Sequence, residues 1–411
     1  MVREPFTRRF GTNQSRQSTH PKPESELNRR AFVQVLAAGL LVTVTEEPAF
    51  GQRRGRGRGS RGARNVAARL HINQDGTITV MTGKVEEGQG SRAQLTQAAA
   101  EELRVDVAKI TLVMADTDLV PDDGITAGSR TTPSTVPAVR QGAAAARELL
   151  ARHVAEQWKV DRAALDVNDG VVSDKTTKRT VSYAQLLKSS EIAESFQQDI
   201  PAEIPLVPEH QWIAMGTSVA RPNLRDLVTG GHRYPSDIVR PGMLYGKVLR
   251  PPAYGATLES IDLSAAKAMK DVVVVREGTF VGFAAPTTFR AEQALKAAAT
   301  TANWKTVSHP SSRDLFTHLR ENAGRGRPST RGSIGSALSG ASKVHSASYK
   351  VAYVQDTPME PRAATADWND PILTVWAGID YPHRIQGDLS RAFEIPAERV
   401  RFILPAMGAG Y

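Results

Sequence analysis

Residues 68–103 place the strongest local constraint on the fold, because three backbone patterns follow one another in a short stretch. Two β-like runs, 68–72 and 77–81, flank Asp75-Gly76, a dipeptide that favours a tight hairpin. A glycine-rich stretch, GKVEEGQG, comes next, and in the following SRAQLTQAAAEELRV the apolar residues recur at helical spacing. This order predicts a β-hairpin, a glycine turn and then a helix.

The glycine turn lies where a ligand could bind. Ser91 and Gln94 fit the S-x-x-Q capping box, which predicts that the helix starts directly after Gly90. Free backbone N–H groups at a helix start attract anions. The turn Gly88-Gln89-Gly90 is therefore a candidate anion site, although a plain strand–turn–helix connection explains the same pattern.

A second glycine- and hydroxyl-rich segment follows a predicted strand at 110–114. The segment TAGSRTTPST belongs to an irregular loop over 116–137, before a helix expected to begin near Val139. Loops of this length inside compact domains are usually functional or disordered. The acids of this loop, in DTD and DD, match no metal-binding spacing, so we expect them to be solvated turn residues rather than a metal cage.

The rest of the chain alternates strands and helices. Strands are expected at 243–249, 256–261 and 272–276, with helices at 264–269 and 290–300, and VVVVREGTFVGFAA is expected to be a core strand. Residues 306–345 have the composition of a linker. Residues 346–411 combine strands with a helix at 385–393 and a glycine-rich end.

The first residues indicate export. Arg29 and Arg30 precede an apolar run over 33–44 that is too short to span a bilayer, which needs about 20 residues. This arrangement fits a twin-arginine signal over residues 1–51 and predicts a periplasmic protein without a membrane span in its mature form. An ordinary amphipathic helix is the alternative.

Composition limits the partners. The net charge of +9 in 411 residues is concentrated near the N-terminus, where QRRGRGRGSRG fits either an RNA-binding segment or, as we prefer, an Arg/Gly linker over 52–65. Because no aromatic residues interleave with these arginines, we expect no nucleic-acid partner. The chain has no cysteine, which excludes disulfides, thiolate nucleophiles and any iron–sulfur cluster bound by this chain.

Several ordered motifs together resemble a known family. The segments TPMEPRAATADW, LTVWAGIDYPHRIQGDLSRAFEIPAERVRFILP and MGAGY resemble the start of the molybdenum-binding region in large subunits of the xanthine dehydrogenase/aldehyde oxidase family. VTGGHRYPSDIVRPGMLYGKVLRPPAYGA is similar to the family's α/β hammerhead domain. GKVEEGQGSRAQLTQAAAEEL and DTDLVPDDGITAGSRTTPS resemble two cofactor-binding segments, and their position ahead of the hammerhead is the rearranged order of isoquinoline 1-oxidoreductase-like large subunits.

The resemblance implies an α+β, multi-domain fold in which partial molybdopterin-binding segments flank a hammerhead domain. The implied boundaries are a molybdopterin-binding segment at 66–225, the hammerhead at 226–305, a linker at 306–345, and the start of a second molybdopterin-binding segment at 346–411.

The resemblance also implies the cofactor-contacting residues. The turn contacts the molybdopterin through its backbone and its glutamine, the hydroxyl-rich segment lines the phosphate and dinucleotide portion, and the C-terminal glycines approach the metal. The implied residues are Gly88, Gln89, Gly90, Ala127, Gly128, Ser129, Thr131, Gly408, Ala409, Gly410 and Tyr411.

The sequence departs from the family pattern at several positions. Glu87 stands where the family usually has an apolar residue, Asp380 where a glutamine is frequent, and QDTPMEP replaces the more usual His-Ala before PMEP. The chain ends at Tyr411, ahead of the half of the domain that carries the family's catalytic glutamate. We therefore expect no catalytic residue or direct metal ligand in this chain, and no activity from it alone.

The implied reaction is hydroxylation of an aldehyde or N-heteroaromatic substrate with water as oxygen donor. The cofactor expected from bacterial relatives is molybdopterin cytosine dinucleotide. Electrons would pass to a [2Fe-2S] small subunit, with a cytochrome as a candidate acceptor, because a cysteine-free chain cannot hold the clusters. The alternative is a non-catalytic cofactor-binding or assembly protein of the same family.

Overall fold

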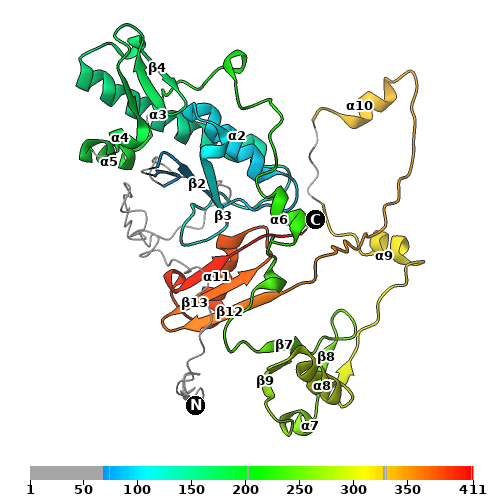
Figure 1. Ribbon diagram of the computed structural model, residues 1–411. Coiled ribbons are helices and arrows are strands. Elements are labelled where there is room, and N and C mark those ends of the chain that lie inside the picture. Colours follow the sequence, from blue (N-terminus) through cyan, green and yellow to red (C-terminus); the bar gives the residue numbers. More distant parts are fainter. Residues whose placement is uncertain are drawn as a thin grey trace. The chain divides into compact units, whose positions relative to one another are not determined.

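The structure is a computed structural model that describes residues 68–73, 75–187, 189–200, 203–326, 329, 331–408 and 410. The expected signal region and nearly all of the Arg/Gly linker lie outside these residues. The chain forms two compact units, one made of the residues up to Ile238 together with Met359–Gly410, and the other of Val239–Pro358 (Figure 1). Within the described residues, no helix combines the length and the hydropathy needed to cross a bilayer.

In the residues that the structure describes, the first unit contains three three-stranded sheets. Their strands are, in sheet order, β1 (Leu70–Ile72), β2 (Ile78–Thr82) and β3 (Ile110–Met114); β4 (Leu165–Asn168), β5 (Val171–Asp174) and β6 (Thr180–Ser182); and β12 (Ala364–Asn369), β13 (Ile372–Ala377) and β14 (Val400–Ile403). Its helices are α2 (Ser91–Leu103), α3 (Val136–Trp158), α4 (Tyr183–Leu186), α5 (Ser190–Gln197), α6 (Leu224–Thr229) and α11 (Pro382–Phe393). Short 3₁₀ or π turns are η2 (Val107–Lys109), η3 (Thr131–Thr135), η4 (Arg162–Ala164), η5 (Glu209–Gln211), η6 (Pro235–Asp237) and η7 (Ala397–Arg399).

One arrangement occurs twice in this unit. β1 and β2 form an antiparallel hairpin, and α2 then leads to β3, which pairs in parallel with β2. In the same way β12 and β13 form a hairpin, and α11 leads to β14, which pairs in parallel with β13. An antiparallel bridge between Asp116 and Ile403 joins the carboxyl end of β3 to that of β14.

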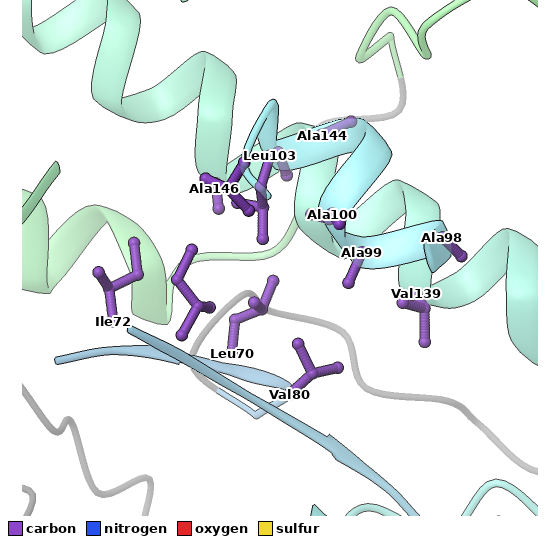
Figure 2. Packing of buried hydrophobic residues seen from close by; sticks show 14 of the residues in the cluster. Leu70, Ile72, Val80, Ala98, Ala99, Ala100, Leu103, Val139, Ala144 and Ala146 are labelled. Atoms are coloured by element: carbon purple, nitrogen blue, oxygen red, sulfur yellow. The ribbon is translucent and has the colours of Figure 1, made fainter. Parts of the chain in front are cut away.

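Alanines let the helices approach the first sheet closely. α2 packs against α3, and both lie over β1 and β2, with Leu70, Ile72 and Val80 facing the helices (Figure 2). The labelled helix residues in this contact are Ala98, Ala99, Ala100, Leu103, Val139, Ala144 and Ala146, and all are buried (Figure 2). Small side chains shorten the distance between helix axes, so this core depends on the alanines as much as on the larger residues.

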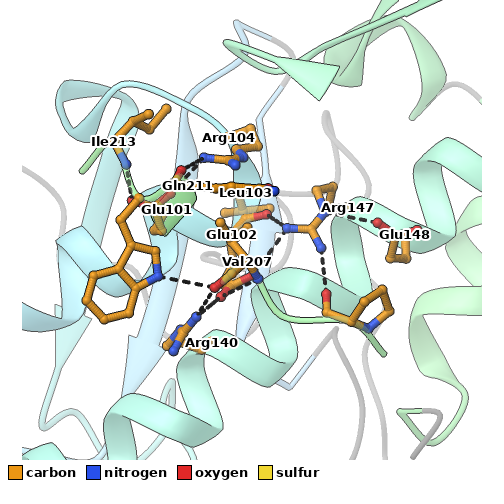
Figure 3. Close-up of polar contacts among 12 residues, drawn as sticks. Glu101, Glu102, Leu103, Arg104, Arg140, Arg147, Glu148, Val207, Gln211 and Ile213 are labelled. Carbon is orange, nitrogen blue, oxygen red and sulfur yellow. Dashed lines mark hydrogen bonds and ion pairs between the residues drawn. The ribbon is translucent and has the colours of Figure 1, made fainter. Parts of the chain in front are cut away.

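Two buried carboxylates at the end of α2 hold a returning segment of chain. Glu101 accepts hydrogen bonds from the backbone N–H groups of Ile213, Ala214 and Met215 at 2.7–3.0 Å. Glu102 accepts from the N–H of Val207 and forms ion pairs with Arg140 (2.6 Å) and Arg147 (3.1 Å) (Figure 3). Neither glutamate side chain is exposed to solvent. The two carboxylates therefore fasten residues 205–215 to the helix pair.

The second unit has its own small core. Its strands are β7 (Tyr245–Val248), β8 (Thr257–Ser260), β9 (Val273–Glu277), β10 (Phe280–Ala285) and β11 (Asn303–Lys305), in sheets of order β7-β10-β9 and β11-β8. Its helices are α7 (Ser264–Lys267), α8 (Thr288–Ala299), α9 (Leu315–Glu321) and α10 (Ile334–Ser339). α8 packs on β7 and β10, around Val281, Phe283 and Ala294. The assignment of this unit as a hammerhead domain stays a prediction.

Most predicted elements are confirmed, with small shifts at their ends. The hairpin at Asp75-Gly76, the strand at 110–114 and a helix directly after Gly90 are all present. α11 begins three residues before the predicted start because Pro382 occupies its first turn. The α+β fold class is confirmed.

Two predictions are wrong. No capping box forms at Ser91, since the N-cap is Gly90 and the Ser91 hydroxyl instead donates to the Val85 carbonyl. VVVVREGTFVGFAA is an antiparallel hairpin, because a turn at Gly278, with φ of +56°, separates β9 from β10. Residues 306–345 contain the short helices α9 and α10, and their assignment as a linker stays a prediction.

The Glu102 contacts lead to a stability prediction. Glu102→Gln removes the buried negative charge opposite Arg140 and Arg147, and we expect a loss of about 3 kcal/mol in the free energy of unfolding. Glu156→Gln, on the exposed side of α3, is the control and should change this free energy by less than about 0.5 kcal/mol. Urea unfolding measures both, and equal effects would contradict the role assigned to Glu102.

Candidate functional site

Four loops of the first unit start at the carboxyl ends of its parallel strands. Residues 83–90 follow β2, 115–130 follow β3, 378–381 follow β13 and 404–410 follow β14. Because the bridge between Asp116 and Ile403 brings the two sheets together at these ends, the four loops converge. Crevices at the carboxyl ends of parallel strands are common ligand sites.

Backbone contact between the first two loops leaves no room for a side chain at Gly83. A Cβ atom on Gly83 would lie 2.3 Å from the carbonyl oxygen of Pro121 and 2.9 Å from the nitrogen of Asp123. Lys84 is buried and donates to the Ile125 carbonyl at 2.6 Å, and the N–H of Val85 donates to the Thr126 hydroxyl at 3.0 Å. The two loops are thus fixed to each other by their main chains.

Asp123 is the anchor of this pair of loops. It forms a bidentate ion pair with Arg69 and accepts hydrogen bonds from the Thr82 hydroxyl (2.6 Å) and the Gly83 N–H (3.0 Å). Burial acts to raise the pKa of Asp123, but the Arg69 guanidinium and these hydrogen bonds hold it below its usual value. The expectation that the acids of DTD and DD are solvated is wrong for Asp123 and for Asp116, which pairs with Arg401.

The predicted anion site at the start of α2 is already filled. The Glu86 carboxylate accepts from the N–H groups of Gly88, Gly90 and Arg92 at 2.8–3.0 Å. Free N–H groups were predicted to face the turn, and the structure corrects this prediction. Glu86 is not among the residues predicted from the sequence, although an acid two residues before a glycine turn at a helix start could have indicated this contact.

The predicted site residues of the turn keep accessible polar atoms and open faces. A Cβ on Gly88 or Gly90 would meet no atom within 4 Å. The exposed Gln89 side chain accepts from the Glu87 N–H at 2.6 Å and donates to the Val85 carbonyl at 3.2 Å. Because a carboxamide offers two donors and two acceptor positions, Gln89 retains capacity for a ligand.

The hydroxyl-rich segment lies beside the turn. Gln94, in the first turn of α2, is hydrogen-bonded to Thr132 at 2.9 Å. Ala127, Gly128 and Ser129 are exposed, and Ser129 has a positive φ of 56°. Thr131 is buried at the start of η3, so its side chain does not share the exposed face of the other predicted residues.

The C-terminal glycines reach the same place. The Gly408 N–H donates to Glu360 at 2.6 Å, and a Cβ on Gly410 would lie 2.2 Å from an oxygen of Glu87. The structure therefore brings together the turn, the hydroxyl-rich segment and Gly408 and Gly410. Ala409 and Tyr411 lie outside the described residues.

Asp380 belongs to this arrangement through its backbone. The N–H of Thr126 donates to the Asp380 carbonyl at 2.9 Å, which ties the loop after β13 to the loop after β3. The next residue, Tyr381, donates to Asp122 at 3.2 Å. Two departures from the family pattern, Glu87 and Asp380, therefore lie within the convergent loops.

Glu87 differs from the other carboxylates of the site. Its Oε1 atom is buried and has no hydrogen-bond partner in the described part of the chain. Burial raises the pKa of Glu87 to about 7, and the negative charges of Asp380 and Glu86 act in the same direction. The folded protein therefore favours the protonated form of this side chain.

This pKa gives a pH-dependent prediction. The usual value is 4.5, so ionisation of Glu87 reduces stability progressively between pH 4.5 and about 7 and costs a constant amount above that range. Glu87→Gln removes this cost. Because Glu87 is only partly buried, we expect the variant to be more stable than the wild type by about 1 kcal/mol at pH 8, with no difference near pH 4.

Denaturant unfolding at several pH values measures the difference. Glu194→Gln, on the exposed face of α5, is the control and should follow the wild type throughout. A difference between Glu87→Gln and the wild type that does not change with pH would contradict the assignment.

Comparison with known proteins agrees with this geometry. Residues 20–224 and residues 317–411 each match a family described as a molybdopterin cofactor-binding domain. The chain is 29% identical over 355 residues to a subunit of nicotinate dehydrogenase from Pseudomonas putida, covering 83% of this chain and 29% of that protein. It is 26% identical over 396 residues to the beta subunit of isoquinoline 1-oxidoreductase from Brevundimonas diminuta, covering 84% of this chain and 50% of that protein.

A shorter match extends the relationship. A stretch of 95 residues of this chain is 37% identical to a putative xanthine dehydrogenase molybdenum-binding subunit of Escherichia coli. The match covers 23% of this chain and 13% of that protein. The chain thus spans half or less of the length of these relatives. The two matched domains contain the glycine segments that the structure brings together. From these domains and the named relatives, the chain belongs to the molybdopterin-binding large subunits of the xanthine dehydrogenase family.

Proposed function

We propose that this chain binds a molybdopterin cofactor as part of a molybdenum hydroxylase that oxidises an aldehyde or an N-heteroaromatic compound with water as the oxygen donor. The observation that carries the proposal is the convergence of the turn at 88–90, the segment at 127–129 and the glycines at 408 and 410. When bound, the cofactor supplies two-electron oxidation and the activation of water.

The residues present fit such a cofactor at two places with different chemistry. Gly88, Gly90 and Gly128 leave open faces on which a flat ring system could lie against the backbone. Ser129 and Arg130 are exposed and offer a hydroxyl donor and a guanidinium, which suit phosphate oxygens. The start of α2 does not fit a phosphate, because Glu86 occupies it.

The metal would be held through the pterin. Within the described residues, no three His, Cys, Asp or Glu side chains are grouped so as to hold a metal ion. The protein's own contribution would be to bind and orient the cofactor. Glu87, with a pKa of about 7, could also hold a proton next to the C-terminal glycines.

The same proposal includes an iron–sulfur partner subunit and a periplasmic location. Because the chain contains no cysteine, iron–sulfur clusters that accept the electrons would belong to another protein chain, for which a [2Fe-2S] small subunit is the proposal. The twin-arginine pattern supports export to the periplasm, and the cytosine dinucleotide form of the cofactor is proposed from the family resemblance.

A second candidate is a non-catalytic cofactor-binding or assembly protein. The observation that favours it is Glu87, which lies against Gly410 where the family usually has an apolar residue, and whose buried Oε1 has no hydrogen-bond partner in the described residues. The two candidates differ in turnover and agree in cofactor binding.

Cofactor content tests the proposal. Arg130→Ala removes an exposed guanidinium that we assign to a phosphate, and we expect about tenfold weaker retention of pterin, as for the loss of a charge-assisted hydrogen bond. Gln89→Ala should also lower retention. Arg152→Ala, an exposed arginine on α3, is the matched control and should retain the wild-type amount.

The measurements are molybdenum by mass spectrometry and pterin by fluorescence after oxidative release, for the full chain purified from a host that makes the cofactor. Equal pterin in all variants would show that the residues are wrongly assigned. A wild-type chain without pterin would contradict the function itself. Turnover of aldehydes or N-heterocycles, assayed with the iron–sulfur subunit present, separates the two candidates.

A further inference from the structure

The Glu86 carboxylate makes an unusually complete set of contacts for a single side chain in a loop. It is 6% exposed and accepts from several donors around the turn and from one remote residue. These donors are the N–H groups of Gly88 (3.0 Å), Gly90 (2.9 Å) and Arg92 (2.8 Å), the Ser91 hydroxyl (3.3 Å) and the Arg221 guanidinium (3.1 Å).

These contacts use the acceptor capacity of the carboxylate. An ionised carboxylate has about four lone-pair positions, so little capacity remains for any other donor. The positive end of α2 and the Arg221 charge both favour the ionised form. Burial acts to raise the pKa of Glu86, but the N–H donors of Arg92 and Gly90 and the Arg221 charge hold it below its usual value.

The turn depends on this carboxylate, because among the described residues the N–H groups of Gly88, Gly90 and Arg92 have their side-chain acceptor in Glu86. Gly88 and Gly90 have φ values of +94° and +86°, a region that costs most residues free energy. The N-cap residue Gly90 has no side chain that could cap α2, and the Gln94 carboxamide is hydrogen-bonded to Thr132 instead. A single carboxylate thus joins the two glycine N–H groups to the first turn of the helix.

We propose that Glu86 is a positioning residue, an internal anion that sets the shape of the Gly88–Gly90 turn and closes the start of α2 to phosphate groups of a ligand. The turn then offers open glycine faces and the Gln89 carboxamide to an uncharged part of the ligand. The statement about the ligand rests on the proposed function. The statement that Glu86 closes the start of α2 to other anions does not depend on it.

Rescue by a small carboxylate tests the proposal. Glu86→Ala leaves a gap lined by the same N–H groups and by Arg221, and we expect its melting temperature to fall by at least about 5 °C in chloride buffer. Acetate at constant ionic strength should restore at least about half of that loss. Glu87→Ala is the matched control, because Oε1 of this adjacent carboxylate is buried without a hydrogen-bond partner among the described residues, and acetate should not act on it or on the wild type.

Inorganic phosphate tests whether the site is closed. Phosphate should raise the melting temperature of Glu86→Ala more than that of the wild type, since only the variant leaves the start of α2 open. Equal effects of acetate on Glu86→Ala and Glu87→Ala, or equal effects of phosphate on the variant and the wild type, would overturn the proposal.

A milder variant keeps the test decisive if Glu86→Ala does not fold. In Glu86→Gln one oxygen can still accept from the glycines, but an NH₂ group faces the Arg92 N–H. Hydrogen exchange at the start of α2 should then be about tenfold faster than in the wild type, and unchanged exchange would overturn the proposal. None of these measurements needs bound cofactor, so a chain that lacks pterin would contradict the proposed function and leave this result intact.

Discussion

The ion pair between Asp116 and Arg401 is the contact on which the position of the whole site depends. It is bidentate, at 2.6 and 3.0 Å, and joins residues 285 positions apart. Backbone hydrogen bonds from Leu404 to Ala115 and from Thr117 to Phe402 continue the junction on both sides. The four loops of the site follow directly after β2, β3, β13 and β14, whose sheets this junction joins. The junction therefore determines where the loops lie relative to one another.

Carboxylates have structural roles throughout these loops. Asp123 joins two loops through Arg69, Glu86 shapes the turn, and Glu360 holds the N–H of Gly408. Glu87 is the exception among these side chains, because it lies against Gly410 and its buried Oε1 finds no hydrogen-bond partner in the part of the chain that the structure describes. A site rich in carboxylates can thus accommodate an anionic cofactor if backbone donors and arginines already neutralise most of the carboxylate charge. The phosphates would then be left to exposed groups such as Arg130.

Local features could be predicted from the sequence, and long-range ones could not. The hairpin at Asp75-Gly76, the strand at 110–114 and the helix after Gly90 follow from turn chemistry and periodicity within a few residues. The glycine segments could be assigned to one site only through family resemblance, because their proximity depends on the bridge between Asp116 and Ile403, which joins the ends of β3 and β14. The role of Asp123 was missed because its partner Arg69 is remote in sequence. Most donors to Glu86 are local and could have indicated its role, whereas its contact with the remote Arg221 could not be predicted.

The insertion of the second unit between the two halves of the first has a consequence for biosynthesis. Asp116 leaves the ribosome 285 residues before Arg401, a delay of roughly 15–60 s at ordinary elongation rates of about 5–20 residues per second. During that time the N–H donors at the start of α2 can already close around Glu86, because Gly88, Gly90 and Arg92 are its neighbours in sequence. β3 can pair with β2 in this time, but Asp116, just beyond its end, has to wait for Ile403 and Arg401, which lie near the end of the unit.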